Sequence, residues 1–460
     1  MIKYPPMIRT DVPKPQSLRW RVFQLAWPVI LEGLLQTMLG IVDTIMVGRL
    51  GANALAGVGT AQQFVFFVIA ILSGVSIGSS ILAAQAVGAR DLFTAGRVAR
   101  QSLIWALALS IPLAILGVLF STSLMHLMGV TDAVAAIGGG YLNITMLTSV
   151  VLCVPFTAGA VLRGAGDTRT PLVATSVANV VNAVVAYILI FGALGVPALG
   201  PVGSAWGASA GRLVSCAILI FALWRGRQGF SIRGREGWRP EKALMQRVVS
   251  LGAPAALEQV IVSAGFLVMA VVVASLGTNS LAAQRVVGNL LGVSLLPGFG
   301  FGIAATALVG QSIGARDPDE GEAAARIAIQ WALIWMSGLG LVYIFLRAPL
   351  VALFSADPEV LRIGADSLIP LGLTQPLWAI AFVASGALRG AGNTRFPLLM
   401  SILVIWGTTL LGFFNVHFLH LGLPFVWGGF IVFSPITCYL TWRQFKHGSW
   451  KKLTFVPSQA

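Results

Sequence analysis

The chain has 460 residues, of which 57% are hydrophobic and only 10% are charged. This composition is typical of a protein embedded in lipid and excludes an assembly of soluble domains, whose surfaces would need more charged side chains. A net charge of +14 would suggest nucleic-acid binding in a soluble protein. Here the basic residues lie mostly in short connections between apolar segments, where they orient a chain in the membrane, so we expect no nucleic-acid partner.

Breaks at proline, glycine and charged residues divide the chain into twelve apolar segments. Each can cross a bilayer, which takes about 20 residues. The segments are 22–47, 54–82, 99–121, 134–160, 172–194, 202–224, 248–275, 280–307, 325–346, 366–387, 398–418 and 423–442. In the connections, all basic residues except Arg49, Arg347 and Arg362 lie on the side of the N-terminus. The positive-inside rule therefore predicts that both termini are cytoplasmic.

The first segment places a carboxylate, Asp43, deep within an apolar run. A charged side chain near the bilayer centre costs roughly 2.5 to 3.5 kcal/mol on insertion scales, so it normally faces a cavity, a partner or an ion path. On a helix, Glu32, Gln36 and Asp43 fall within an arc of roughly 40° and form one polar stripe. Asp43 is the central functional candidate, with a structural hydrogen bond between helices as the alternative.

The fifth segment carries a second polar stripe, because Ser176, Asn179 and Asn182 are spaced three residues apart among valines and alanines. Buried amides need partners. They could hydrogen-bond a carboxylate, supply oxygen atoms to a bound cation, or join two helices. Gln62 and Gln284 are weaker candidates of the same kind, for a gate or for packing.

The two halves of the chain repeat each other at an offset of 226 residues. Leu-Arg-Gly-Ala-Gly-Asp-Thr-Arg-Thr-Pro-Leu at 162–172 returns as Leu-Arg-Gly-Ala-Gly-Asn-Thr-Arg-Phe-Pro-Leu at 388–398. The same offset relates Gln85 to Gln311 and Gly88 to Gly314. Two six-span units enter the membrane from the same side because six is even, which predicts parallel repeats with the substrate path between them.

These boundaries predict an all-α membrane protein of twelve transmembrane helices in two parallel-repeat lobes of six helices. The expected parts are a cytoplasmic N-terminal segment 1–21, an N-terminal lobe 22–224, a basic cytoplasmic linker 225–247, a C-terminal lobe 248–442 and a cytoplasmic tail 443–460. The charge of the linker serves topology and solubility or binds anionic lipid headgroups.

The repeat also distinguishes the buried carboxylates. Glu32 recurs as Glu258, about one helical turn after a proline in each half, whereas Asp43 aligns with an apolar residue. An acid that occurs at the same position in both halves suggests a structural role. We therefore expect both glutamates to have a packing or gating role and to pair with Arg163 and Arg389 of the repeated motif. A symmetric packing role does not explain Asp43.

Other chemistry finds little support in the sequence. The glycine-rich repeated motif lacks the spacing of a phosphate-binding loop; its glycines, with Asp167 or Asn393, suit a tight turn between helices. The three cysteines have no metal-ligand spacing, and the four histidines lie at span ends or in the tail. We therefore expect no enzyme activity, no metal, no cofactor and no obligate protein partner.

The motifs resemble those of bacterial MATE (multidrug and toxic compound extrusion) transporters. The resemblance rests on Pro-Val-Ile-Leu-Glu at 28–32, on Gly-Ile-Val-Asp-Thr-Ile-Met-Val-Gly-Arg-Leu-Gly at 40–51 and on the two glycine-rich motifs, and covers roughly residues 20–445. It implies a V-shaped pair of six-helix lobes, alternating access, and export of organic, often cationic, compounds in exchange for protons or sodium. The family's first-span aspartate corresponds to Asp43, and its span-five asparagine to Asn182.

The chain departs from the family pattern at three positions. An aspartate that several branches of the family carry is replaced here by Ala186, and two acids of a sodium-coupled branch are replaced, by spacing, at about Val262 and Trp378. Because sodium needs about five or six oxygen ligands, these losses favour the proton as the coupling ion, with sodium as the less favoured alternative. The expected coupling residues are Asp43, Asn182, Asn179 and Gln36.

The sequence thus predicts a secondary antiporter of the bacterial inner membrane, with an organic small molecule and the lipid bilayer as its partners. A flippase for a lipid-linked precursor is an alternative, but such relatives are longer and have cationic cavities. A membrane scaffold without transport is a second alternative, which leaves Asp43 unexplained.

Overall fold

A computed structural model describes residues 17–226, 228–234 and 236–452. The predicted N-terminal segment and tail lie largely outside these residues. The first half contains α1 (Leu18–Gly48), α2 (Ala52–Gly88), α3 (Leu92–Leu127), α4 (Asp132–Leu147), α5 (Ser149–Gly164), α6 (Arg169–Phe191) and α7 (Pro201–Arg225). The second half contains α8 (Lys242–Ala274), α9 (Thr278–Gly314), α10 (Pro318–Phe345), α11 (Arg347–Ala352), α12 (Pro358–Gly390), α13 (Arg395–His417) and α14 (Leu423–Lys446).

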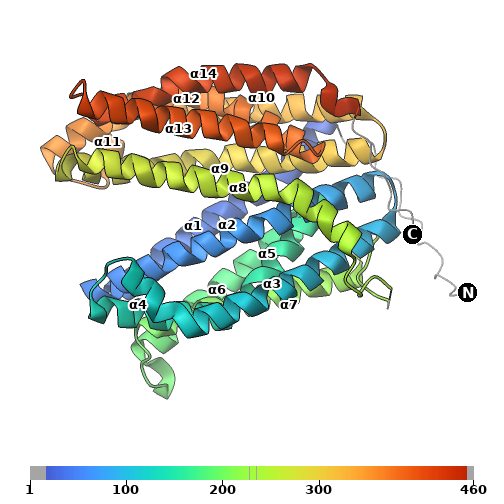
Figure 1. Ribbon diagram of the computed structural model, residues 1–460, viewed down its shortest axis with the longest axis horizontal. Coiled ribbons are helices and arrows are strands. Elements are labelled where there is room, and N and C mark those ends of the chain that lie inside the picture. The colour runs from blue at the N-terminus through green and yellow to red at the C-terminus, as the bar shows by residue number, and fades with distance from the viewer. Residues whose placement is uncertain (1–16, 227, 235, 453–460) are drawn as a thin grey trace, which may run out of the picture.

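Eleven of these helices are long and apolar enough to cross a membrane, and α4 with α5 forms a twelfth, bent span. Over the described residues no β-strand is present. The chain is therefore a multi-pass membrane protein of the predicted all-α class. The short α11 is an addition to the predicted elements, at the end of the molecule opposite the start of α1 (Figure 1).

The bent span differs from the single segment predicted at 134–160. Helices α4 and α5 meet at Thr148 with an angle of 57° between them. The Thr148 hydroxyl donates to the Ile144 carbonyl at 2.8 Å, and it lies 2.8 Å from the Ser209 hydroxyl of α7. A hydroxyl that bonds back to the preceding turn competes with the helical ladder and bends a helix. Apolar content alone does not reveal this bend.

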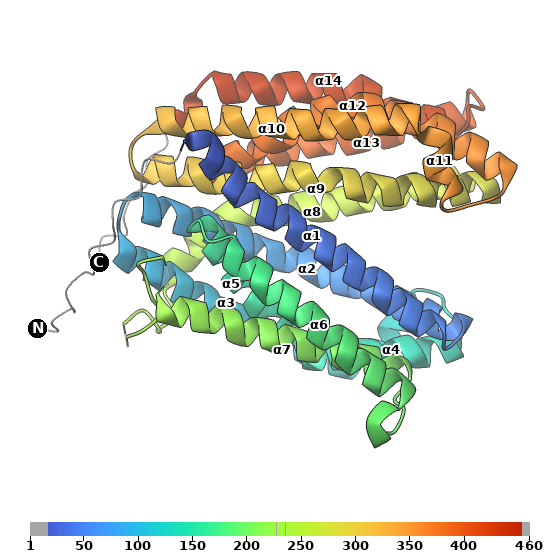
Figure 2. The same ribbon diagram turned by 180° about the vertical axis from the view of Figure 1, so that it is seen from behind.

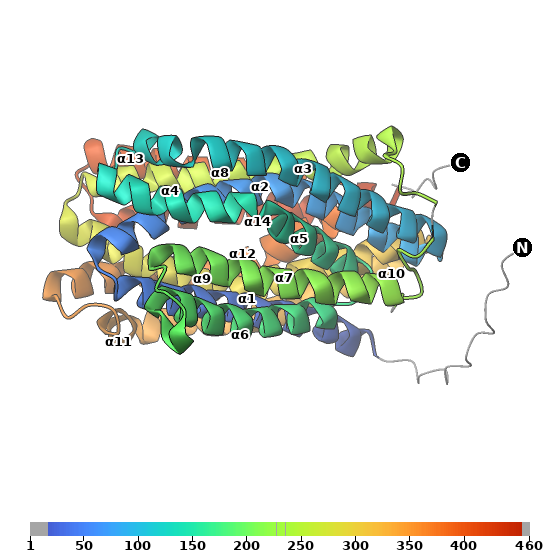
Figure 3. The same cartoon turned by 90° about the horizontal axis from the view of Figure 1, so that it is seen from below.

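The helices form two lobes that meet at one end of the molecule and diverge toward the other (Figure 2). We call the meeting end, where α1 begins and α14 ends, the terminal end, and the opposite one the distal end. The connection between α7 and α8 also lies at the terminal end (Figure 3). Contacts between the lobes include the approach of Gly74 to Gly252 and of Gly78 to Val248.

The first turns of α1 and α8, the first helix of each lobe, pack against the opposite lobe. Val22, Leu25 and Ala26 of α1 pack in the hydrophobic core that the second half forms. Leu244 and Val248 of α8 pack in the core of the first half. Because these apolar side chains are buried in the opposite lobe, the two lobes are tied together at the terminal end.

A second close approach of the lobes lies where α2 and α9 end. A Cβ atom built on Gly88 would lie 1.9 Å from the Gln311 carbonyl oxygen, and one built on Gly314 would lie 1.9 Å from that of Gln85. The two glutamine side chains cross as well: Gln85 donates to the Gly390 carbonyl, and Gln311 donates to that of Gly164, both at 3.2 Å. Only glycine permits this crossing of backbones.

The repeated glycine-rich motifs form the predicted tight turns. Gly166 and Gly392 both have φ near +94°, which favours glycine. The Asp167 carboxylate accepts from the Thr170 backbone N–H at 2.9 Å, and the Asn393 side chain closes the equivalent turn in the second lobe. These turns set the start of α6 and α13.

Candidate cation-coupling site

The structure brings Asp43 of α1 and Asn182 of α6 together inside the first lobe. Both side chains are buried, with 8% and 4% of their surface exposed. The Asn182 Nδ2 group donates to Asp43 Oδ2 over 3.5 Å, which is long for a hydrogen bond. The carboxylate and the amide therefore face each other without a tight contact.

Within the part of the chain that the structure describes, the other oxygen of each group has no hydrogen-bond partner. Asp43 Oδ1 and Asn182 Oδ1 are both buried acceptors left unsatisfied. An unsatisfied buried polar atom costs about 1 to 3 kcal/mol, and more when it is charged. A proton on Asp43 would turn the carboxylate from an acceptor into a donor. A cation between the two oxygen atoms would satisfy both of them.

Arg212 of α7 adds a positive charge to this site. Its charge acts on the Asp43 carboxyl and on Tyr141, while its Nη1 atom is buried without a hydrogen-bond partner. The neighbouring Gly211 allows α7 to approach α6, because a Cβ atom there would lie 3.0 Å from the Asn182 Cβ atom. The site thus holds one carboxylate and one guanidinium that are near each other but form no ion pair in the described structure.

Tyr141 of α4 and Gln62 of α2 complete the surroundings. The Tyr141 side chain is 4% exposed, and its hydroxyl interacts with the side chains of Gln62 and Thr145. The charge of Asp43 also acts on this tyrosine. Gln62 was only a weak candidate in the sequence, and its place beside Tyr141 puts it at the edge of the Asp43 site.

Two predicted coupling residues lie apart from the carboxylate. Asn179 donates to the Leu35 carbonyl of α1 at 2.8 Å, so its amide joins α6 to α1. Gln36 is exposed, and no hydrogen bond to Asp43 is present in the described residues. Asn182 is therefore the one amide of the predicted set that reaches the acid.

The repeated glutamates pair as predicted. Glu32 accepts from Arg163 at 3.3 Å, and Glu258 accepts from Arg389 at 2.7 Å. Each pair joins the first helix of a lobe to the end of its fourth span. Each carboxylate also accepts a hydrogen bond from a hydroxyl at matching positions, Thr175 at 3.2 Å and Ser401 at 2.7 Å.

Replacement of either glutamate by glutamine should lower stability and leave transport intact. Glu32→Gln and Glu258→Gln each keep an oxygen acceptor but lose the charge that pairs with arginine. We expect the apparent melting temperature in detergent to fall by roughly 2 to 4 °C in both variants, since a charge-assisted hydrogen bond is about twice as strong as a neutral one. Efflux measured at a temperature where both variants are folded should match the unmodified protein. Complete loss of efflux in either variant would assign that glutamate to the transport cycle instead.

The second lobe lacks the equivalent carboxylate. At the positions matching Asp43 and Asn182 it carries Met269, which is 1% exposed, and Thr408, which is fully buried. Trp378 donates to the Ser434 hydroxyl at 2.9 Å, so it serves packing. Gln284 accepts from the Trp427 indole at 2.8 Å and joins α9 to α14.

No metal centre is apparent in the part of the chain that the structure describes, because no three His, Cys, Asp or Glu side chains gather there. Sequence reasoning missed Arg212 and Tyr141 as neighbours of Asp43. For Arg212 a signal was present, since a charged residue within an apolar segment needs a partner as much as Asp43 does.

The described residues form eleven helical spans and one bent span in two lobes, with a buried carboxylate and amide in one lobe. These features define the chain as a multi-pass membrane protein of the transporter class. Comparison with known proteins specifies the family. The sequence profile of the MatE family matches residues 28–188 and 254–413. The chain therefore belongs to the MATE family of bacterial transporters.

Similar curated sequences cover nearly the full chain. A protein named probable multidrug resistance protein NorM from Thermotoga maritima is 29% identical over 450 residues, covering 97% of this chain and 96% of that protein. Multidrug resistance protein NorM from Burkholderia vietnamiensis is 28% identical over 448 residues, covering 95% and 96%.

Solved structures share the fold. A MOP superfamily transporter from Pyrococcus furiosus superposes with a TM-score of 0.87 at 22% identity, covering 95% of this chain and 97% of that one. A structure described as MATE in the bent conformation gives a TM-score of 0.87 at 23% identity, covering 95% and 98%. The two-lobe architecture is thus the MATE fold.

Proposed function

We propose that the chain is a secondary antiporter of the bacterial inner membrane that exports organic, mainly cationic, compounds in exchange for protons. Membership of the MATE family and the names of the relatives, which describe multidrug resistance proteins, support drug export. The basic connections at the terminal end support a cytoplasmic position for both termini. Transport would require the coupling ion and the substrate, and no resident cofactor.

The two unsatisfied oxygens, Asp43 Oδ1 and Asn182 Oδ1, carry this proposal. Protonated Asp43 would donate to Asn182 and satisfy an otherwise orphaned acceptor. A sodium ion would need more oxygen ligands than this pair supplies. The positive charge of Arg212 opposes binding of either ion at this carboxyl, and sodium has too few ligands there to offset that repulsion. The site therefore suits a proton better than a metal cation.

The protonation state of Asp43 would then bias the two arrangements of the lobes. A ligand shifts a conformational equilibrium only if it binds the two states with different free energies. In the arrangement with the terminal end closed, a proton from the distal side would neutralise Asp43. The electrostatic attraction between Asp43 and a cationic substrate would then weaken. Release of the proton on the terminal side would restore the charge for the next substrate.

Efflux from proteoliposomes tests the coupling ion. With an ethidium-like cation as substrate, we expect a proton gradient at fixed sodium to drive transport. A sodium gradient at fixed pH should drive little or none. Robust transport on sodium alone, lost when potassium replaces sodium, would overturn the proton assignment.

Arg212→Gln is the matched variant for this experiment. It removes the competing positive charge and keeps Asp43 and Asn182 in place. We expect some stimulation by sodium to appear while transport driven by protons persists, because the field that opposes any positive charge at Asp43 is lost. A variant that remains indifferent to sodium would show that the missing ligands, and not Arg212, exclude this ion.

A further inference from the structure

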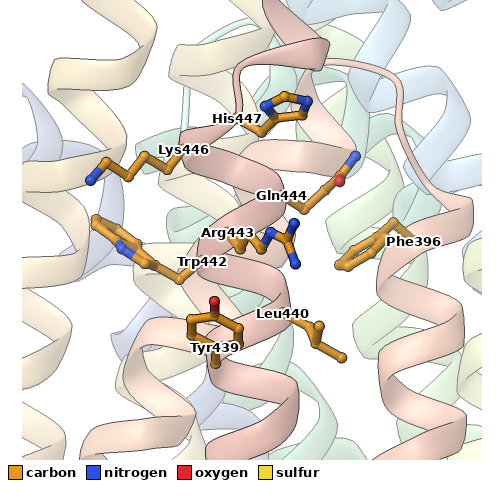
Figure 4. Close-up of a pocket in the computed structure, with 8 residues that line it drawn as sticks. All are labelled: Phe396, Tyr439, Leu440, Trp442, Arg443, Gln444, Lys446 and His447. Atoms are coloured by element: carbon orange, nitrogen blue, oxygen red, sulfur yellow. The ribbon is translucent and has the colours of Figure 1, made fainter.

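A groove at the terminal end of the second lobe is not used by the transport site. It is lined by Phe396 at the start of α13 and by the last two turns of α14, and has a volume of about 620 Å³. Figure 4 shows the Arg443 side chain extending from α14 toward Phe396. The α14 residues of the lining are Tyr439, Leu440, Trp442, Arg443, Gln444, Lys446 and His447.

The side chains of this groove are layered along α14. On the distal side of the groove, the outer face of α14 is apolar, with Val432 and Ile436 exposed. Tyr439 follows, 62% exposed, and Arg443 and Lys446 lie nearer the helix end (Figure 4). An apolar face, then aromatic rings, then basic groups is the order of a bilayer from acyl chains to headgroups.

No acidic side chain of the described residues neutralises the charge of the groove. Among these residues no Asp or Glu lines it, and none lines the adjoining groove that contains Arg395. Among the described residues, Arg443 and Lys446 have no ion pair. Other bases at the same end do find carboxylates, such as Arg97 with Glu241. The groove therefore presents positive charge to an external partner.

The linker contacts the end of the matching helix in the first lobe, although Trp224 there stays 48% exposed. Helix α7 ends with Trp224 and Arg225, as α14 nears its end with Trp442 and Arg443. In the first lobe the linker folds back: the Arg233 guanidinium lies 3.9 Å over the Trp224 ring, and Ser231 donates to the Trp224 carbonyl at 2.7 Å.

After α14 the chain turns away from the groove. Trp450 is buried and stacks on Phe445 with ring centroids 5.5 Å apart. Lys451 then pairs with Asp319 at 2.8 Å and with Glu322 at 2.6 Å, both on α10. Residues 452–460 contain no Asp or Glu. This segment therefore offers no side-chain anion to the groove.

We propose that this groove binds the headgroup of an anionic phospholipid from the leaflet at the terminal end. The phosphate would accept from Arg443 and Lys446, and the glycerol region would lie beside the rings of Tyr439 and Phe396. The acyl chains would follow the exposed apolar face of α14. Clusters of basic residues at a membrane surface attract anionic lipid, while the aromatic groups fix its depth.

Native mass spectrometry of the full chain with added lipid tests this site. We expect phosphatidylglycerol to bind more tightly than phosphatidylcholine. Arg443→Gln combined with Lys446→Gln should weaken phosphatidylglycerol binding by about twenty-five-fold, since each basic residue contributes a factor of about five. Binding of phosphatidylcholine should hardly change. Inorganic phosphate at the same concentration should not displace the lipid, because it lacks the acyl chains.

The matched control is Arg19→Gln combined with Arg316→Gln. It removes the same charge from the same end of the molecule, outside the groove, and should retain lipid binding. Lys446→Gln alone, with an expected loss of about fivefold, serves if the double variant does not fold. Equal affinity for the two lipids, or equal loss in control and test variants, would overturn the proposal. So would binding that appears only after removal of residues 453–460, because the chain's own tail would then be the occupant.

Discussion

Asp43→Asn is expected to abolish efflux driven by an ion gradient while the protein still folds and inserts. The amide is nearly the same size as the carboxyl but cannot release a proton, so it imitates only the neutral state. A ligand that no longer distinguishes two states cannot shift the equilibrium between them. Transport should therefore fall by at least roughly tenfold.

Stability separates this effect from misfolding. Replacement of a buried, incompletely paired acid by an amide should leave the apparent melting temperature unchanged or raise it, because a charge no longer has to be desolvated. Met269→Leu, at the matching position of the second lobe, is the control and should transport normally. If Asp43→Asn protein moved substrate at the normal rate under the same gradient, the coupling role of Asp43 would be wrong.

The architecture follows from the sequence because its signals are strong and local. Spans of about 20 apolar residues are read directly, and the constant offset of 226 reveals the two lobes. The repeat also predicts the pairing of Glu32 with Arg163 and of Glu258 with Arg389. When a contact occurs in both lobes, both of its residues recur in the sequence at the same offset, and this recurrence identifies the pair. A contact that occurs only once has no such signal in the sequence.

The details of the site depend on how helices cross, which the sequence leaves open. Asn179 and Asn182 share one face of α6, yet only Asn182 reaches Asp43. The bend at Thr148 depends on a hydroxyl that could equally have faced lipid. Arg212 was missed because its neighbours in the site come from other helices. In each case the deciding contact is tertiary.

The repeated glycines Gly88 and Gly314 lead to the second large prediction. Replacement of both by alanine should weaken the closed terminal end. Each new Cβ atom would meet a backbone oxygen at 1.9 Å in the present arrangement, and a backbone cannot move aside as a flexible side chain can. The lobes would have to separate where α2 and α9 cross.

The expected size of the effect follows from the cost of overpacking. Extra methyl groups in a tight contact cost about 1 to 3 kcal/mol, and an equilibrium between two arrangements shifts by roughly five- to hundredfold for such energies. The double variant should therefore populate an arrangement with the terminal end open, and its transport should slow.

Distances between spin labels measure this shift. Labels at Arg90→Cys and Arg316→Cys, in a chain whose three native cysteines are replaced by alanine, report the separation of the ends of α2 and α9. We expect one short distance in the parent chain and an added, longer one after Gly88→Ala with Gly314→Ala. The control is Gly288→Ala with Gly338→Ala, where a Cβ atom meets nothing within 4 Å. An unchanged distance distribution in the double variant would show that these two glycines do not hold the terminal end closed.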